Sequence, residues 1–118
     1  RRMQKHVDKG YAEAQLVLGQ AFQNGDKGLK QSHKRAFELY QLAAAQGHAA
    51  AQQTLGRSYY EGFVVKIDHK TAAQWYRRAA EQGYPPAQYF LGVMFYEGVG
   101  VAKSYDEAVK WFRLAAVR

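Results

Sequence analysis

The chain has 118 residues, of which 47% are hydrophobic and 23% are charged, so it can form one domain with an apolar core and is not disordered by composition. It contains no cysteine, which excludes a disulfide framework, a thiolate zinc site and a cysteine nucleophile. The net charge of +7 permits binding to nucleic acid, an acidic protein or an anionic surface, and no apolar run approaches the roughly 20 residues that span a bilayer.

The first predicted element is a helix over residues 1–9. Lys9-Gly10-Tyr11 follows it and matches Gln82-Gly83-Tyr84 further along the chain. A glycine directly after a helix suits the left-handed conformation that ends many helices. We therefore expect residues 1–11 to be the tail of a truncated preceding repeat, ending at Gly10.

The next segment, residues 12–48, is predicted to form one helix–turn–helix unit with helices over 12–24 and 33–46. Three apolar residues of the first helix recur at every fourth position and therefore lie on one face, namely Ala14, Leu18 and Phe22. Ser32 is a good N-cap for the second helix, and Gly47 follows its end.

The same pattern returns twice, in residues 49–84 and 85–118. The predicted helices there cover residues 49–61, 69–82, 85–97 and 105–117. Each unit repeats an alanine–glutamine pair and a leucine–glycine pair: Ala14-Gln15 with Leu18-Gly19, Ala51-Gln52 with Leu55-Gly56, and Ala87-Gln88 with Leu91-Gly92. Each second helix repeats an alanine pair: Ala43-Ala44, Ala79-Ala80 and Ala115-Ala116. The spacing predicts three stacked copies of one helical hairpin.

This pattern, A-Q-x-x-L-G-x-x-Y-x-x-G followed by W-Y-x-x-A-A-x-x-G, resembles the Sel1-like repeat family, which is related to the tetratricopeptide repeats. The resemblance extends from about Lys9 to Ala116. The turn of the third unit, Gly98-Val99-Gly100-Val101, keeps the family's form, whereas Gly62-Phe63-Val64-Val65 and Gly25-Asp26-Lys27-Gly28 depart from it. The resemblance implies an all-α fold in which residues 1–118 form a single domain, an α/α right-handed superhelical solenoid with a concave groove. It also implies an adaptor that assembles other proteins.

Residue types with catalytic or metal-binding chemistry do not recur as a site. Two of the four histidines, His33 and His69, directly follow helix N-caps, and no acidic or histidine partner recurs three or four residues away from them. His48 is expected to pack at a unit boundary. The chain has three serines, and none belongs to a nucleophile motif or a phosphate-cradling glycine loop. The sequence therefore predicts no enzymatic activity, no metal site and no cofactor.

The side chains between the structural positions of the first helices are expected to face the concave surface. They include tyrosine and arginine, which are enriched at interface hot spots. The predicted partner-binding residues are Leu16, Gln20, Gln53, Arg57, Tyr60, Tyr89, Val93 and Tyr96. For Tyr60 and Tyr96, packing against the next unit is an alternative explanation. We expect a protein or peptide partner and a monomeric chain.

Basic residues are concentrated outside the first helices of the units. Arg57 is the one basic residue there, and the others lie in the loops, the second helices or residues 1–11. A nucleic-acid groove needs lysine and arginine interleaved with aromatic residues. A nucleic-acid partner is therefore not favoured for the groove. Binding of a polyanion or nucleic acid through the basic convex face remains the alternative function.

Overall fold

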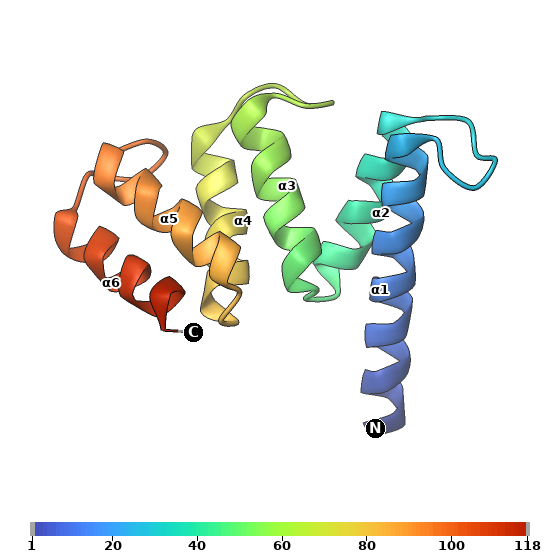
Figure 1. The fold of residues 1–118 in the computed structure, drawn as a ribbon, viewed down its shortest axis with the longest axis horizontal. Helices are drawn as coiled ribbons and strands as arrows, with labels where there is room; N and C mark the ends of the chain where they lie inside the picture. Colours follow the sequence, from blue (N-terminus) through green and yellow to red (C-terminus); the bar gives the residue numbers. More distant parts are fainter. Residues whose placement is uncertain (1, 118) are drawn as a thin grey trace.

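The computed structural model describes the backbone of residues 2–117 and the side chains of residues 10–117. Over this range the chain is all-α, with six helices and no strand: α1 (Arg2–Asn24), α2 (His33–Ala45), α3 (Ala49–Glu61), α4 (His69–Glu81), α5 (Pro85–Glu97) and α6 (Tyr105–Ala116). The helices pair as α1–α2, α3–α4 and α5–α6, and the pairs stack side by side as a solenoid (Figure 1). None of these helices has the length and apolar character needed to cross a membrane. The all-α repeat fold predicted from the sequence is confirmed.

The predicted helix end at Gly10 is wrong, because α1 runs without a break from Arg2 to Asn24. Glycine accepts either helical or left-handed backbone conformations, so its neighbours decide between them. After α2 the backbone turns at Gly47, with a φ of 92°, and the turn is held by a hydrogen bond from the His48 N–H to the Ala43 carbonyl. At the place that matches the packed pair Ala43-Ala44, the first segment has His6-Val7 instead. The residues that stop α2 are therefore not repeated there.

The N-caps of the second helices are confirmed. Ser32, Asp68 and Ser104 each have an extended backbone, and each side chain accepts a hydrogen bond from the backbone N–H three residues later, at 3.0–3.2 Å. Such a bond satisfies one of the amide groups that a helix start leaves unpaired. These helices therefore start where the local sequence places them.

The core consists of two clusters that meet at α3. One combines α1, α2 and α3, and the other combines α4, α5 and α6. The half-buried Tyr59 packs against both. Within each helical hairpin, a glycine of the first helix faces a ring of the second: a Cβ added to Gly56 would lie 3.0 Å from Cδ1 of Tyr76. Small residues opposite rings bring the paired helices close together.

The glutamines of the repeated alanine–glutamine pairs connect neighbouring units. Gln52 is buried and donates through Nε2 to the Ala44 carbonyl at 3.2 Å, and Gln88 does the same to the Ala80 carbonyl. Gln52 also accepts a 2.8 Å hydrogen bond from Gln82. These bonds pair polar groups that the stacking of units would otherwise leave buried without partners.

The three loops within the hairpins lie along one edge of the solenoid (Figure 1). Their third residues are Lys27, Val64 and Gly100, and all three have a left-handed backbone, with φ of 60°, 72° and 75°. The left-handed turn at this position is therefore retained in the first two units, although their sequences depart from the glycine-rich turn of the third.

Candidate functional site

A cleft of about 340 Å³ lies between α3 and α5, where the second and third units meet. It is lined by both first helices and by one ring of α4: Arg57, Tyr60, Glu61, Tyr76, Tyr89, Phe90, Val93 and Met94. The repeat places matching positions of successive first helices side by side. Four of the predicted groove residues therefore line one cavity.

Aromatic rings form much of the cleft wall. Tyr76 stacks on Phe90 with their ring centroids 5.5 Å apart, and Phe90 meets Tyr89 edge-on at 5.6 Å. Tyr60, on the other side, packs against His69 at 4.8 Å. Rings that support one another present a large apolar area and lose little conformational entropy when a ligand binds.

The polar groups of the cleft are balanced in charge. Arg57 Nε lies 3.4 Å from Glu61 Oε2, one helical turn away. Burial raises the pKa of the Tyr76 phenol, and the Glu61 carboxylate raises it further. Tyr76 therefore keeps its proton at neutral pH and can donate a hydrogen bond to a ligand. The cleft thus combines apolar surface with hydroxyl and guanidinium donors.

Arg57 also borders two clefts on the side of α1. One has a volume of about 220 Å³ and includes Gln53 and Gln23, and the larger has about 800 Å³ and includes Gln20, Val17 and Leu18. Arg57 therefore borders all three clefts, which lie beside the first helices of the units.

Two predicted groove residues lie elsewhere. The expectation that Leu16 faces the groove is wrong, because Leu16 is 7% exposed and belongs to the core cluster of α1, α2 and α3. The buried face of α1 is centred on Ala12, Leu16 and Gly19, not on Ala14 and Leu18, because α2 covers that side of the helix. Tyr96 lies outside the cleft and packs on Tyr105 at 5.2 Å.

Four lining residues were not among the predicted site: Glu61, Tyr76, Phe90 and Met94. Tyr76 is a buried core residue of α4, and it also lines the cleft. Phe90 is 39% exposed. A large apolar residue next to Tyr89, off the buried face of its helix, was the signal in the sequence that pointed to it.

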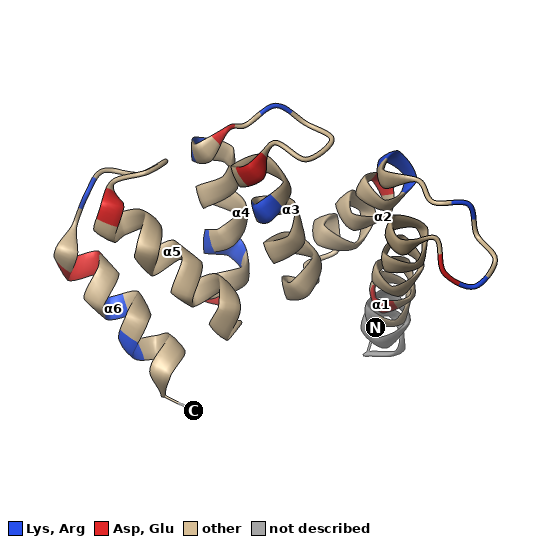
Figure 2. Cartoon of the chain, turned by 45° about the horizontal axis from the view of Figure 1, so that its top comes forward, with Lys and Arg blue, Asp and Glu red and all other residues tan. Residues whose placement is uncertain are grey.

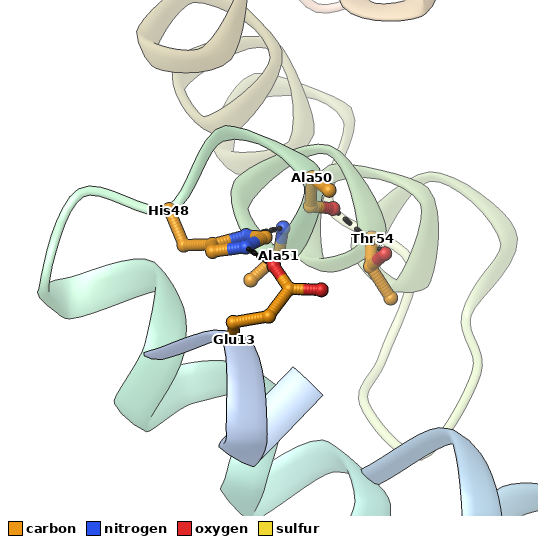
Figure 3. Close-up of polar contacts among 5 residues, drawn as sticks. All are labelled: Glu13, His48, Ala50, Ala51 and Thr54. Carbon is orange, nitrogen blue, oxygen red and sulfur yellow. Dashed lines mark hydrogen bonds and ion pairs between the residues drawn. The ribbon is translucent and has the colours of Figure 1, made fainter. Parts of the chain in front are cut away.

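His48 does more than pack at a unit boundary. Its Nδ1 accepts a hydrogen bond from the Ala51 N–H at 3.2 Å, and its Nε2 lies 2.7 Å from Glu13 Oε1 (Figure 3). Because Nδ1 accepts, Nε2 carries the proton and donates a hydrogen bond to the Glu13 carboxylate. His48 therefore caps α3 and ties α3 to α1.

The back of the second unit carries cations that already have partners. Arg77 lies 4.0 Å from Glu81, and the Arg78 guanidinium lies 4.7 Å from the centre of the Trp75 ring. Both line a shallow cleft of about 390 Å³ beside Lys70 and Gly100. Residues 10–117 contain no group of three histidine, aspartate or glutamate side chains arranged to hold a metal ion.

A family model described as Sel1 repeat matches residues 12–48, 49–84 and 85–116. The structure is similar to a Sel1 repeat protein from Oxalobacter formigenes, at 38% identity and a TM-score of 0.85 over 89% of this chain. It is also similar to a protective antigen of uropathogenic Escherichia coli strains that displays an SLR fold, at 40% identity and a TM-score of 0.86 over 98% of this chain. Helicobacter pylori cysteine rich protein B is similar at 26% identity and a TM-score of 0.70, and the match covers 92% of this chain and 88% of the Helicobacter chain.

The chain spans 43% of the Oxalobacter protein and 24% of the Escherichia coli protein. No curated protein sequence matches it.

Proposed function

The chain belongs to the Sel1 repeat family, and from this premise we propose that it is a non-catalytic scaffold that binds a peptide or protein partner on its concave face. The observation that carries this proposal is the cleft between α3 and α5, where four rings and one arginine from adjacent units line about 340 Å³. Clefts that combine apolar walls with a few directed polar groups are the usual form of a binding site.

The chemistry of the cleft favours a peptide with an apolar anchor. Tyr89 is 53% exposed and Phe90 39% exposed, so both rings have apolar area to bury on binding. The phenol of Tyr76 and the guanidinium of Arg57 can donate hydrogen bonds to peptide carbonyls beside that anchor. Since Arg57 already pairs with Glu61, the cleft does not require an acidic ligand.

The test begins with a partner isolated by affinity capture on the intact chain. Its dissociation constant is then measured for Tyr89→Ala and Arg57→Ala, with Arg78→Ala as the matched change on the back. Loss of a central anchor costs about 2 kcal/mol, which corresponds to roughly 30-fold weaker binding. We expect that loss for Tyr89→Ala, a smaller loss for Arg57→Ala, and none for Arg78→Ala.

The opposite pattern would place the ligand on the basic back. In that case Arg78→Ala alone weakens binding, and the affinity falls steeply with salt, as expected for a polyanion. Far-ultraviolet circular dichroism of each variant separates loss of binding from loss of fold.

A further inference from the structure

The loop between α3 and α4 exposes apolar side chains at the edge of the solenoid. Phe63, Val64 and Ile67 are 36%, 47% and 60% exposed. Exposed apolar residues that occur singly are common on protein surfaces, whereas these three lie within five positions of one loop and form a patch. We refer to these three residues as the apolar tip.

The backbone at the apolar tip is strained. Val64 has a φ of 72°, a left-handed conformation that is rare for β-branched residues. Glycine occupies the matching position of the third unit, as Gly100, with a φ of 75°. A glycine would serve the turn better, so the turn itself does not account for a valine here. Strain of this kind is typical of functional positions.

Basic side chains lie in the loop that carries the apolar tip and in the neighbouring loop of the first unit. The ring of Phe63 lies 4.7 Å from that of His33, so the tip touches the start of α2 in the preceding unit. Residues 25–35 and 62–70 together carry six basic and two acidic residues, the basic ones being Lys27, Lys30, Lys34, Arg35, Lys66 and Lys70. Figure 2 shows them in the two loops and at the helix starts that follow.

Arg35 lies over the Phe22 ring, 5.7 Å from its centre, and the five lysines are available to an outside partner. None of the ion pairs found among residues 10–117 involves them. Of the two acidic residues, Asp68 is occupied as the cap of α4, where its carboxylate accepts hydrogen bonds from the Thr71 N–H and hydroxyl at 3.0 and 2.8 Å. With six basic and two acidic residues, the two segments carry a net formal charge of +4.

We propose that this edge docks on an anionic lipid surface, with the apolar tip inserted at the interface and the lysines of the two loops among the headgroups. Apolar side chains that enter the interface beside lysines that meet acidic lipids are the two components of peripheral membrane binding. A nucleic acid offers phosphates but no apolar layer for Val64 and Ile67. The docking edge is separate from the cleft between α3 and α5, so this proposal does not depend on the peptide site.

The experiment measures co-sedimentation of the intact chain with vesicles. Vesicles of phosphatidylcholine alone are compared with vesicles that also contain about one third phosphatidylserine, at about 0.15 M salt. Val64→Gly is the decisive variant, because it removes an apolar side chain and relieves the backbone, so the fold is kept. Leu42→Ser, at a residue that is 53% exposed in the last turn of α2, is the matched control.

We expect binding to the phosphatidylserine vesicles only, about fivefold weaker partitioning for Val64→Gly, and no change for Leu42→Ser. Absence of binding to the anionic vesicles overturns the proposal. Equal partitioning of Val64→Gly and the unmodified chain also overturns the proposal, because it would mean that charge alone drives binding to the vesicles. Binding of single-stranded oligonucleotide as tight as that of the vesicles, and independent of Val64, would identify a polyanion site instead.

Discussion

Replacing Gly56 by alanine should destabilise the chain, although alanine is the better helix former. A Cβ at this position would lie 3.0, 3.1 and 3.1 Å from three atoms of the Tyr76 ring. Ordinary contacts between such carbon atoms are about 3.5–4.0 Å. The Tyr76 ring also stacks on Phe90 at 5.5 Å, so moving it away from α3 disturbs a second contact.

The size of the effect follows from two opposing contributions. Alanine in place of glycine inside a helix gains about 1 kcal/mol, and an extra methyl group in a packed contact costs about 1–3 kcal/mol. We expect a net loss of about 1 kcal/mol, which lowers the Tm by roughly 4 °C for a chain of this length. Gly10→Ala is the matched control, since nothing lies within 4 Å of its added Cβ, and it should gain up to about 1 kcal/mol.

Urea denaturation followed by circular dichroism measures both variants. Equal stabilisation by Gly56→Ala and Gly10→Ala would refute the argument that the glycine permits the close approach of α3 and α4. Destabilisation by Gly10→Ala would instead show that α1 is interrupted at Gly10.

Three other changes test separate parts of the structure. Val64→Gly should raise the free energy of unfolding by about 1 kcal/mol, because it removes left-handed strain, and a lower urea midpoint would contradict that reasoning. Gln52→Leu should cost about 1–2 kcal/mol, because it removes the bond to the Ala44 carbonyl, and an unchanged midpoint would show that the bond contributes nothing. The Thr71 hydrogen bonds lower the pKa of Asp68, so its stabilisation is present above the ordinary aspartate pKa and is lost as pH falls through the lowered value. Asp68→Ser should therefore flatten the acid side of a stability–pH profile, and an unaltered profile would refute this role.

Features fixed by adjacent residues could be predicted from the sequence, whereas features set by neighbouring units could not. Ser32 and Ser104 cap their helices through bonds that span three residues, so the local pattern suffices. The burial of Leu16 depends on how α2 covers α1, and the helical state of Gly10 depends on the absence of a counterpart to the packed pair Ala43-Ala44. Both were predicted wrongly for that reason.

The candidate site shows the same division. Arg57, Tyr60, Tyr89 and Val93 were placed by helical geometry within single helices, and they line one cavity. The contribution of Tyr76 could not be foreseen, because its ring belongs to the core and reaches the cleft only through the packing of α4 against α5.

The division of the core into two clusters has a consequence for motion. The clusters share Tyr59, whose ring lies 6.2 Å from Phe37 on one side. A molecule built from such nearest-neighbour contacts opens in segments, so its outer hairpins exchange their amide protons before its middle. The cleft, by contrast, spans the second and third hairpins. A ligand bound there contacts both hairpins and holds them together. Amide hydrogen exchange should therefore slow in the second and third hairpins, while the first hairpin continues to open and exchange as before.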